Sequence, residues 1–354
     1  MHSTRTSGRT GAAGWPDRGS PPRRRLLAGV AAIAAVAAAV LTAGAAGAAR
    51  QGSPAEAGKP AAKARVVGFS QIGAESAWRT AETASIREEA ALRGVELRFS
   101  DAQQKQENQV KALRSFIAQK VDAIILAPVV ETGWEPVLKE IKAAGIPVIL
   151  VDRGVKADPS LYATLIASDF VDEGRQAGRW LARRLGGKGT VVELQGTVGS
   201  APAIDRQKGF MEAMKDQPGI KVLYTQSGDF TRARGKSVME AFLKKAAGEG
   251  ARIDAVYAHN DDMALGAMQA IERAGMTPGK DVILVSIDGT RPAFEAMAAG
   301  TLDCVVECNP LLGPAAFDAV EKALSGKPLP PRTLVQDRLF EKSEAAAALP
   351  GRKY

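Results

Sequence analysis

The sequence predicts an α/β protein that is built from two doubly wound lobes, each with a parallel sheet covered by helices. Short β-rich runs alternate with amphipathic segments from Arg65 onward, which is typical of parallel strands joined by right-handed crossovers. Two of these runs, 123–126 and 147–151, are continuously apolar, as expected for strands that are buried on both faces. More strands are expected than one sheet readily holds, so two lobes, each with its own sheet, are the simpler arrangement.

The first half of this pattern contains four expected strands and three expected helices. In the second helix Val110, Leu113 and Phe116 recur on one face, and the third helix ends before Gly145 and Pro147. The expected strands are 66–69, 95–99, 123–126 and 147–151, and the expected helices are 76–92, 106–119 and 135–144.

The second half repeats the alternation of strands and helices. The expected strands are 161–167, 190–194, 222–226, 255–258, 282–287 and 304–307. The expected helices are 170–185, 204–215, 232–247, 262–274, 291–299 and 312–324. In doubly wound sheets a ligand lies outside the carboxyl ends of the strands, so the residues that follow each strand carry the functional information.

Polar side chains gather at these strand ends. Carboxylates, amides and arginines suit a ligand that is rich in hydroxyl groups, because each hydroxyl both donates and accepts hydrogen bonds. The strand-end residues are Ser70-Gln71 with Glu75-Ser76, Asp152-Arg153, Ser168-Asp169, Asn260-Asp261, Asp288-Gly289 and Glu307-Cys308-Asn309.

The chain begins with a segment that is typical of a secretory signal peptide. Arg23-Arg24-Arg25 precedes an uncharged stretch, 26–49, that is mostly Ala, Val and Leu and allows an Ala-x-Ala cut before Ala49. We expect residues 1–48 to be removed and residues 49–64 to form a flexible spacer. A membrane anchor is the alternative, because the stretch is long enough to span a bilayer, but Ala and Gly dominate it and no stop-transfer pattern follows.

The net charge of +8 overstates the charge of the remaining chain. Residues 1–48 hold six Arg and one Asp, which leaves 41 basic and 38 acidic residues beyond them. A net charge of +3 is too small to indicate nucleic-acid or membrane binding.

The two cysteines, Cys304 and Cys308, fall in one expected strand. Four residues of strand separate their Cα atoms by about 13 Å, whereas a disulfide needs less than about 7 Å. We expect both to be free and buried. A pair that meets across a bend at 307–310 is the alternative.

The sequence contains no complete motif for binding a nucleotide, and we expect no cofactor. Gly235-Lys236-Ser237 matches the end of a phosphate-binding loop, but Phe230 occupies the position of its first glycine. No G-x-G-x-x-G follows a strand.

Catalytic and metal motifs are equally sparse. His259 is the only imidazole beyond the leader, which gives Ser-His-Asp triads little basis. The run 259–262 suggests either a metal site or a helix start that Asp261 caps, and we favour the cap. A mechanism that uses only carboxylates, such as glycoside hydrolysis, stays open because Asp and Glu are abundant.

Two aromatic residues stand beside the polar strand ends. Trp78 lies next to Glu75, Ser76 and Arg79, and Phe230 follows the strand at 222–226. Sugars place their C–H faces on aromatic rings, so both are candidates for a sugar site. The alternative is that Trp78 only packs its own helix, as we expect of Trp134 and Trp180.

From Val66 to about Phe340 the chain resembles the periplasmic sugar-binding proteins of ABC importers, the type I family that includes ribose-binding proteins. Within this family it looks most similar to the galactofuranose-binding members. The stretches that carry the resemblance are 68–71, 75–79, 101–116, 127–130, 132–136, 192–198, 203–206, 227–232, 257–263 and 286–289.

The resemblance implies a ligand site between the lobes, with one hydroxyl-binding arginine from each. These are Arg153, which stands beside Asp152, and Arg206. Glu307 corresponds to a polar contact on the hinge side, and Cys308 is expected beside the pocket without touching it. The complete expected set is Glu75, Ser76, Trp78, Arg79, Asp152, Arg153, Arg206, Phe230, Asn260, Asp288 and Glu307.

The resemblance also implies a three-strand hinge, crossed near Ser168, Asn309 and Leu329. The first lobe then comprises 65–168 and 309–329, and the second comprises 169–308 and 330–354.

The expected function is that of a monomeric periplasmic receptor, not an enzyme, that closes on a monosaccharide and delivers it to an ABC permease. Galactofuranose or a related hexose or pentose is the expected ligand. A secreted carboxylate-based glycosidase is the main alternative. A sugar-responsive transcription regulator would need a DNA-binding module ahead of Arg65, and a receptor for a chemotaxis or sensor protein cannot be separated from a transport receptor by sequence.

Overall fold

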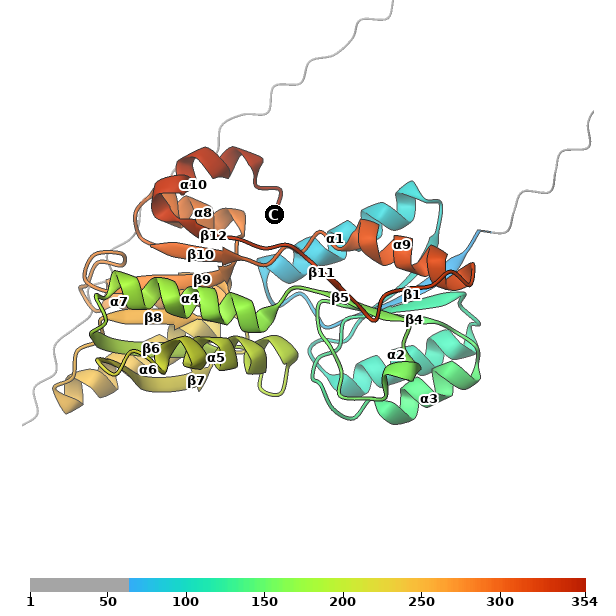
Figure 1. Cartoon of the computed structure of the whole chain (residues 1–354), viewed down its shortest axis with the longest axis horizontal. Coiled ribbons are helices and arrows are strands. Elements are labelled where there is room, and N and C mark those ends of the chain that lie inside the picture. The colour runs from blue at the N-terminus through green and yellow to red at the C-terminus, as the bar shows by residue number, and fades with distance from the viewer. Residues whose placement is uncertain (1–63) are drawn as a thin grey trace, which may run out of the picture. The chain divides into compact units, whose positions relative to one another are not determined.

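The computed structural model describes residues 64–354, which form two α/β lobes (Figure 1). The predicted signal peptide and nearly all of the predicted spacer lie outside the described residues. No helix between residues 64 and 354 is long and apolar enough to cross a membrane.

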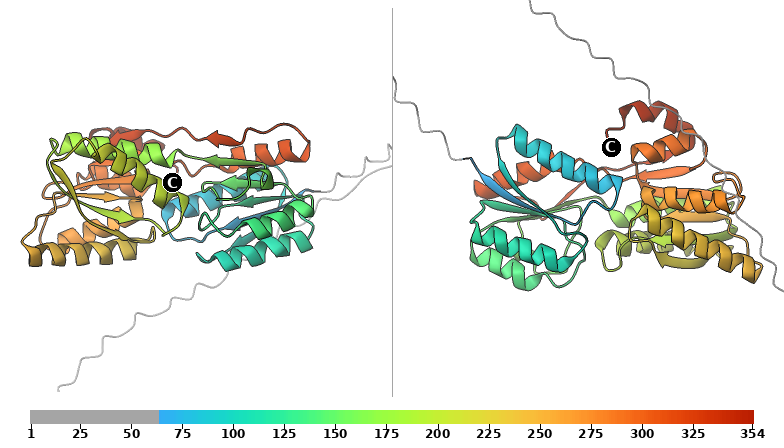
Figure 2. Two further views of the ribbon diagram at one scale, coloured as in Figure 1. Left: turned by 60° about the horizontal axis from the view of Figure 1, so that its bottom comes forward. Right: turned by 180° about the vertical axis from the view of Figure 1, so that it is seen from behind.

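The sheet of the first lobe has the strand order β11-β5-β4-β3-β1-β2, and all its pairings are parallel. Helices α1 and α9 cover one face, and α2 and α3 cover the other (Figure 2). The strands are β1 (Val66–Gln71), β2 (Glu96–Asp101), β3 (Ala123–Leu126), β4 (Val148–Val151), β5 (Thr164–Ala167) and β11 (Arg332–Leu334). The helices are α1 (Ala77–Leu92), α2 (Gln106–Ala118), α3 (Glu135–Ala143) and α9 (Gly313–Leu324).

The sheet of the second lobe has the corresponding order β12-β10-β9-β8-β6-β7, but its edge strand β12 pairs antiparallel with β10. Helices α4 and α5 cover one face, and α6, α7, α8 and α10 the other. The strands are β6 (Gly189–Gln195), β7 (Ile220–Ser227), β8 (Ala255–Ala258), β9 (Ile283–Asp288), β10 (Cys304–Glu307) and β12 (Leu339–Glu341). The helices are α4 (Phe170–Arg184), α5 (Ala201–Met214), α6 (Arg232–Glu249), α7 (Asp261–Arg273), α8 (Arg291–Ala298) and α10 (Lys342–Ala348).

Both sheets have the doubly wound 2-1-3-4-5 order, and the strand order reverses between β1 and β3 and between β6 and β8. Each predicted strand and helix is present, although boundaries differ by a few residues. Strands β11 and β12 and helix α10 were not predicted from the sequence. The two strands have three residues each, and β11 is fully exposed, so neither shows the apolar period that marks a strand.

The chain passes between the sheets three times. The first passage follows β5 and the second follows β10, beside Ser168 and Asn309. The third runs between Leu334 and Leu339, because β11 pairs with β5 and β12 pairs with β10. The predicted third crossing near Leu329 was therefore placed too early, and residues 332–334 belong to the first sheet.

Candidate ligand-binding site

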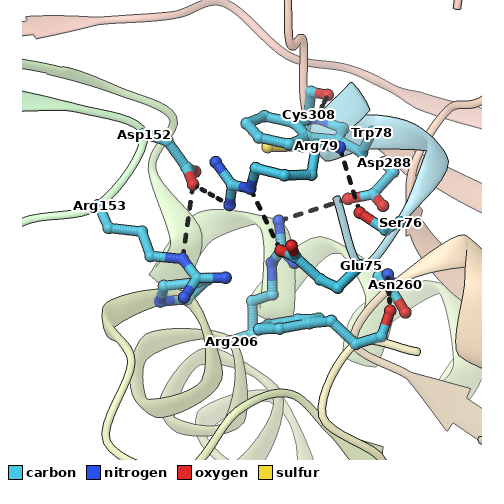
Figure 3. Close-up of a pocket in the computed structure, with 12 residues that line it drawn as sticks. Glu75, Ser76, Trp78, Arg79, Asp152, Arg153, Arg206, Asn260, Asp288 and Cys308 are labelled. Carbon is cyan, nitrogen blue, oxygen red and sulfur yellow. Dashed lines mark hydrogen bonds and ion pairs between the residues drawn. The ribbon is translucent and has the colours of Figure 1, made fainter. Parts of the chain in front are cut away.

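A cavity lies between the two lobes, beyond the carboxyl ends of both sheets (Figure 3). The first lobe contributes residues that follow β1 and β4. The second contributes residues of α5, the last residue of β9 and residues that follow β7, β8 and β10. The lining residues are Glu75, Ser76, Trp78, Arg79, Asp152, Arg153, Pro202, Arg206, Phe230, Asn260, Asp288 and Cys308.

Three carboxylates pair with the guanidinium of Arg79. Its guanidinium lies 3.2 Å from Glu75 Oε1, 2.5 Å from Glu82 Oε2 and 2.6 Å from Asp152 Oδ2. Only 3% of the side chain is exposed. Burial opposes its charge, but these acidic neighbours, Asp152 first, raise the pKa of Arg79 well above its ordinary value. The result is a fixed cation at the wall of the cavity.

Arg153 is paired less completely. Its Nη1 donates to Val129 O at 3.0 Å, while its Nε lies 3.5 Å from Asp152 Oδ2 and has no hydrogen-bond partner. Burial, together with the charge of Arg79, lowers the pKa of Arg153 to about 10. This guanidinium therefore has N–H groups that are free to donate hydrogen bonds to a ligand.

Arg206 supplies the corresponding cation from the second lobe. Its Nε lies 2.7 Å from Glu173 Oε2, and Nη1 donates to His259 O at 2.6 Å. Its Nη2 lies 3.9 Å from Asp288 Oδ1. Burial raises the pKa of Asp288 well above its ordinary value, reinforced by the charge of Asp261, so this carboxyl is suited to exchange hydrogen bonds with a hydroxyl.

Aromatic rings lie against these cations. The Arg79 guanidinium is 4.7 Å from the Trp78 ring centre, and Phe230 lies 5.2 Å from Arg153 and 6.0 Å from Arg206. Phe230 thus bridges the arginines of the two lobes by cation–π contacts. The cavity therefore offers charged donors and acceptors together with flat apolar faces.

Three lining residues have backbone angles in the left-handed region, where side chains other than glycine are uncommon. These are Asp152 with φ 62°, Phe230 with φ 60° and Asp288 with φ 132°. Asp261 supports the turn that follows Asp288, because Asp261 Oδ2 accepts from the backbone N–H groups of Gly289 and Thr290 at 2.9 and 2.8 Å. Strained backbone of this kind clusters at ligand sites.

Two buried polar atoms of the lining have no hydrogen-bond partner within the described residues, and both belong to the first lobe. They are Glu75 Oε2 and Arg153 Nε. An unpaired buried polar atom costs about 1–3 kcal/mol, and native proteins leave few of them without a reason. A polar ligand that both accepts and donates hydrogen bonds would satisfy them.

Direct hydrogen bonds join the lobes around this cavity. Glu131 N donates to Gly199 O at 3.0 Å, and Ala77 N donates to Asp262 Oδ2 at 2.8 Å. Within residues 64–354 no group of three or more His, Cys, Asp or Glu side chains could hold a metal ion.

A family model described as "Periplasmic binding protein domain" matches residues 67–328. The chain belongs to this periplasmic binding protein family. Its two lobes have the type I fold of the family, in agreement with the prediction.

The relatives of this periplasmic binding protein include named sugar-binding proteins. It is 52% identical to a galactofuranose-binding protein of Escherichia coli over 81% of this chain and 91% of the relative. It resembles the arabinose-transporter component of Shewanella sp. ANA-3 bound to L-arabinofuranose, with a TM-score of 0.79 and 52% identity. The match covers 81% of this chain and 95% of the Shewanella chain. A Mycobacterium smegmatis structure with β-D-fucofuranose has TM-score 0.80 and 50% identity, with coverage of 82% and 96%.

Ten of the eleven predicted site residues of this periplasmic binding protein line the cavity, and Glu307 does not. The Glu307 carboxylate instead pairs with Arg352 and accepts from Tyr354 Oη at 3.2 Å. Pro202 also lines the cavity, although it was not predicted from the sequence, and the prediction that Cys308 does not touch the pocket is wrong. Cys308 follows β10 directly, so its strand-end position was the available signal.

Two further predictions concern side chains near the site. Both cysteines are free and buried, as expected. Asn260, not Asp261, caps α7, because Asn260 Oδ1 accepts from Met263 N at 3.0 Å. The predicted Asp261 cap is wrong, since this carboxylate instead binds Ser286 and the turn after β9.

The buried Glu82 behind Arg79 predicts a pH dependence of stability. Burial raises the pKa of Glu82 to about 7, although Arg79 opposes the shift. The ordinary value in an unfolded chain is about 4.3, so between these values the folded state binds more protons, and the free energy of unfolding falls as pH rises. Urea titrations at about pH 5 and pH 7 measure this change. The free energy of unfolding should fall less between the two pH values in Glu82→Gln than in the wild type.

The comparison with Glu82→Gln isolates this group from other buried ones. Burial lowers the pKa of His259, which acts with the opposite sign but is common to both proteins. An identical pH dependence in the two proteins would show that Glu82 is ionised throughout.

Proposed function

We propose that this periplasmic binding protein is a receptor that captures a monosaccharide by closure of its two lobes. The observation that carries the proposal is a cavity between the lobes that Arg153 and Arg206 line from opposite sides, together with the weakly paired Asp288 and the unpaired Oε2 of Glu75. The groups around it both donate and accept hydrogen bonds, and the rings of Trp78 and Phe230 supply the apolar faces that a sugar needs.

The relatives support a furanose or a similar small sugar as the ligand. Galactofuranose, L-arabinofuranose and β-D-fucofuranose stand in the names of proteins that are 50–52% identical to this chain. Specificity would follow from the buried donors and acceptors, since a sugar that lacks one hydroxyl leaves a partner unpaired at about 1–3 kcal/mol.

The delivery of the sugar to an ABC permease, from the periplasm, is part of the same proposal. The leader supports export, and the related component of an arabinose ABC transporter supports the permease as partner. We propose that the closed form is the one that a permease recognises, because closure brings the two lobes into one fixed arrangement.

Thermal-shift screening against a panel of pentoses and hexoses tests the proposal. The panel should include arabinose, galactose, fucose and ribose, with methyl galactofuranosides and the matching pyranosides to separate ring forms. At least one monosaccharide should raise the melting temperature in proportion to the logarithm of its concentration. No shift by any member would contradict the proposal.

The glycosidase alternative gains no support from relatives that are named as binding proteins. Product analysis after prolonged incubation with aryl furanosides separates the two functions. The bound sugar should be recovered unchanged, and turnover that is lost in Glu75→Gln would instead favour the enzyme.

Trp78 should report ligand binding by fluorescence. Its ring lines the cavity, and its Nε1 donates to Cys308 O at 2.6 Å, so ligand and lobe closure both alter its surroundings. We expect a saturable change in tryptophan emission that Trp78→Phe removes. Trp180→Phe is the matched control, since Trp180 lies on α4, packs in the core of the second lobe and does not line the cavity, so its loss should leave the signal in place.

A further inference from the structure

The last four residues, Gly351–Tyr354, return from α10 to the ends of β9 and β10, and we name them the C-terminal strap (Figure 1). Tyr354 O accepts from Arg291 N at 2.5 Å, and Arg352 O accepts from Arg291 Nη2 at 2.9 Å. The strap is therefore anchored to the start of α8 at two points.

Arg352 is the central side chain of the strap. Its guanidinium lies 4.0 Å from the Phe294 ring centre and 4.4 Å from that of Phe340, and only 9% of the side chain is exposed. Its Nη1 pairs with the Glu307 carboxylate, which also accepts from Tyr354 Oη. Arg352 is therefore fixed by stacking and pairing, unlike an arginine that is solvated at the surface.

The strap contacts the turn that presents Asp288 to the cavity. Arg352 Nη1 donates to Gly289 O at 3.4 Å, and Gly289 has φ 90° next to Asp288 with φ 132°. On the opposite side of this turn, Asp261 binds the backbone N–H groups of Gly289 and Thr290. Two consecutive residues in the left-handed region are thus held between a carboxylate and a guanidinium.

The strap also reaches the lining through Glu307. This residue precedes Cys308, whose backbone N–H donates to Asp288 O at 2.9 Å. Arg352 therefore contacts both segments that carry lining residues at this end of the sheet, without touching the cavity itself.

We propose that Arg352 is a positioning residue for the ligand site, which acts through Glu307 and Gly289 to hold Asp288 in its strained conformation. The proposal deepens the proposed sugar-binding function and rests on it for its affinity readout. Glu307, expected from sequence to touch the sugar, then contributes as the partner of Arg352.

Hydrogen–deuterium exchange on the unliganded protein tests the proposal without any ligand. Arg352→Ala should speed exchange in the peptide that spans residues 286–292 by about tenfold or more, while peptides of β1 and β3 stay unchanged. Lys353→Ala, at the exposed neighbouring position, is the matched control and should change neither. Unchanged exchange at 286–292 in Arg352→Ala would overturn the proposal.

Calorimetric titration with L-arabinose, or with whichever panel sugar binds most tightly, gives the second readout. Arg352→Ala and Glu307→Gln should each weaken binding by about tenfold, and the double variant should be no weaker than either single one. Arg352→Lys should recover part of the affinity, because it retains a cation beside Glu307.

The two arms separate this proposal from the proposed function. Wild-type protein that binds no sugar refutes the receptor function, while the exchange result still decides the role of Arg352. A wild-type protein that binds sugar, with affinity unchanged in Arg352→Ala, overturns the positioning role alone. Losses that add up fully in the double variant would also contradict it, since the two residues would then act independently.

Discussion

Replacing Arg153 by alanine is expected to weaken sugar binding by roughly 100-fold or more, because two charge-assisted hydrogen bonds are worth about 1.5–3 kcal/mol each. The folded structure should survive, since Arg153 donates only one hydrogen bond, to Val129 O, and its Nε makes only a long ion pair of 3.5 Å with Asp152. Burial already lowers its pKa to about 10, so its charge is costly without a ligand group beside it. Calorimetric titration, with circular dichroism as the check on folding, measures both effects.

Arg114→Ala provides the matched control for this substitution. Arg114 is an exposed arginine that pairs with Glu140 on the surface, far from the lining residues. Its loss should leave the affinity unchanged and alter stability little, because water and salt screen an exposed ion pair. Equal affinities of Arg153→Ala and the wild type would refute the assignment of the cavity as the sugar site.

Gly174→Ala is expected to cause a large loss of stability. Gly174 in α4 lies against α5, and a Cβ there would overlap the Arg206 backbone carbonyl, which cannot swing aside like a side chain. Overpacking of this kind costs about 1–3 kcal/mol or more. Because the substitution pushes on the turn of α5 that carries Arg206, we expect weaker sugar binding as well.

The control is the same substitution at Gly248. This glycine lies within α6, and a Cβ there would meet nothing within 4 Å. Alanine favours a helix interior over glycine by up to about 1 kcal/mol, so Gly248→Ala should stabilise the protein slightly. Urea unfolding measures both changes, and a neutral or stabilising Gly174→Ala would show that α4 and α5 can separate at no cost.

The order of strands and helices was predictable because apolar periodicity marks each element. The buried strands β3 and β4 are fully apolar, and α2 places Leu113 and Phe116 on its buried face. β11 and β12 were not predictable, since their three residues join the sheets only through pairing with β5 and β10. The position of the third crossing depends on that long-range pairing.

The site was predictable as far as the fold dictates it. Asp152, Arg153 and Asp288 directly follow or end strands, and parallel sheets bring such residues to one edge. The place of Glu307 was not predictable from its strand-end position, because strand-end residues can also face away from the cavity. Its partner Arg352 lies 45 positions along the chain, and no local pattern indicates that contact.

The crystal structure of the protein with the tightest-binding sugar of the panel tests the central claim most directly. We expect one monosaccharide enclosed between the lobes, with its hydroxyls bonded to Arg153 of the first lobe and to Arg206 or Asp288 of the second. The unpaired Glu75 Oε2 should gain a partner from the sugar. A sugar bound outside this cavity, or contacts confined to one lobe, would contradict the account.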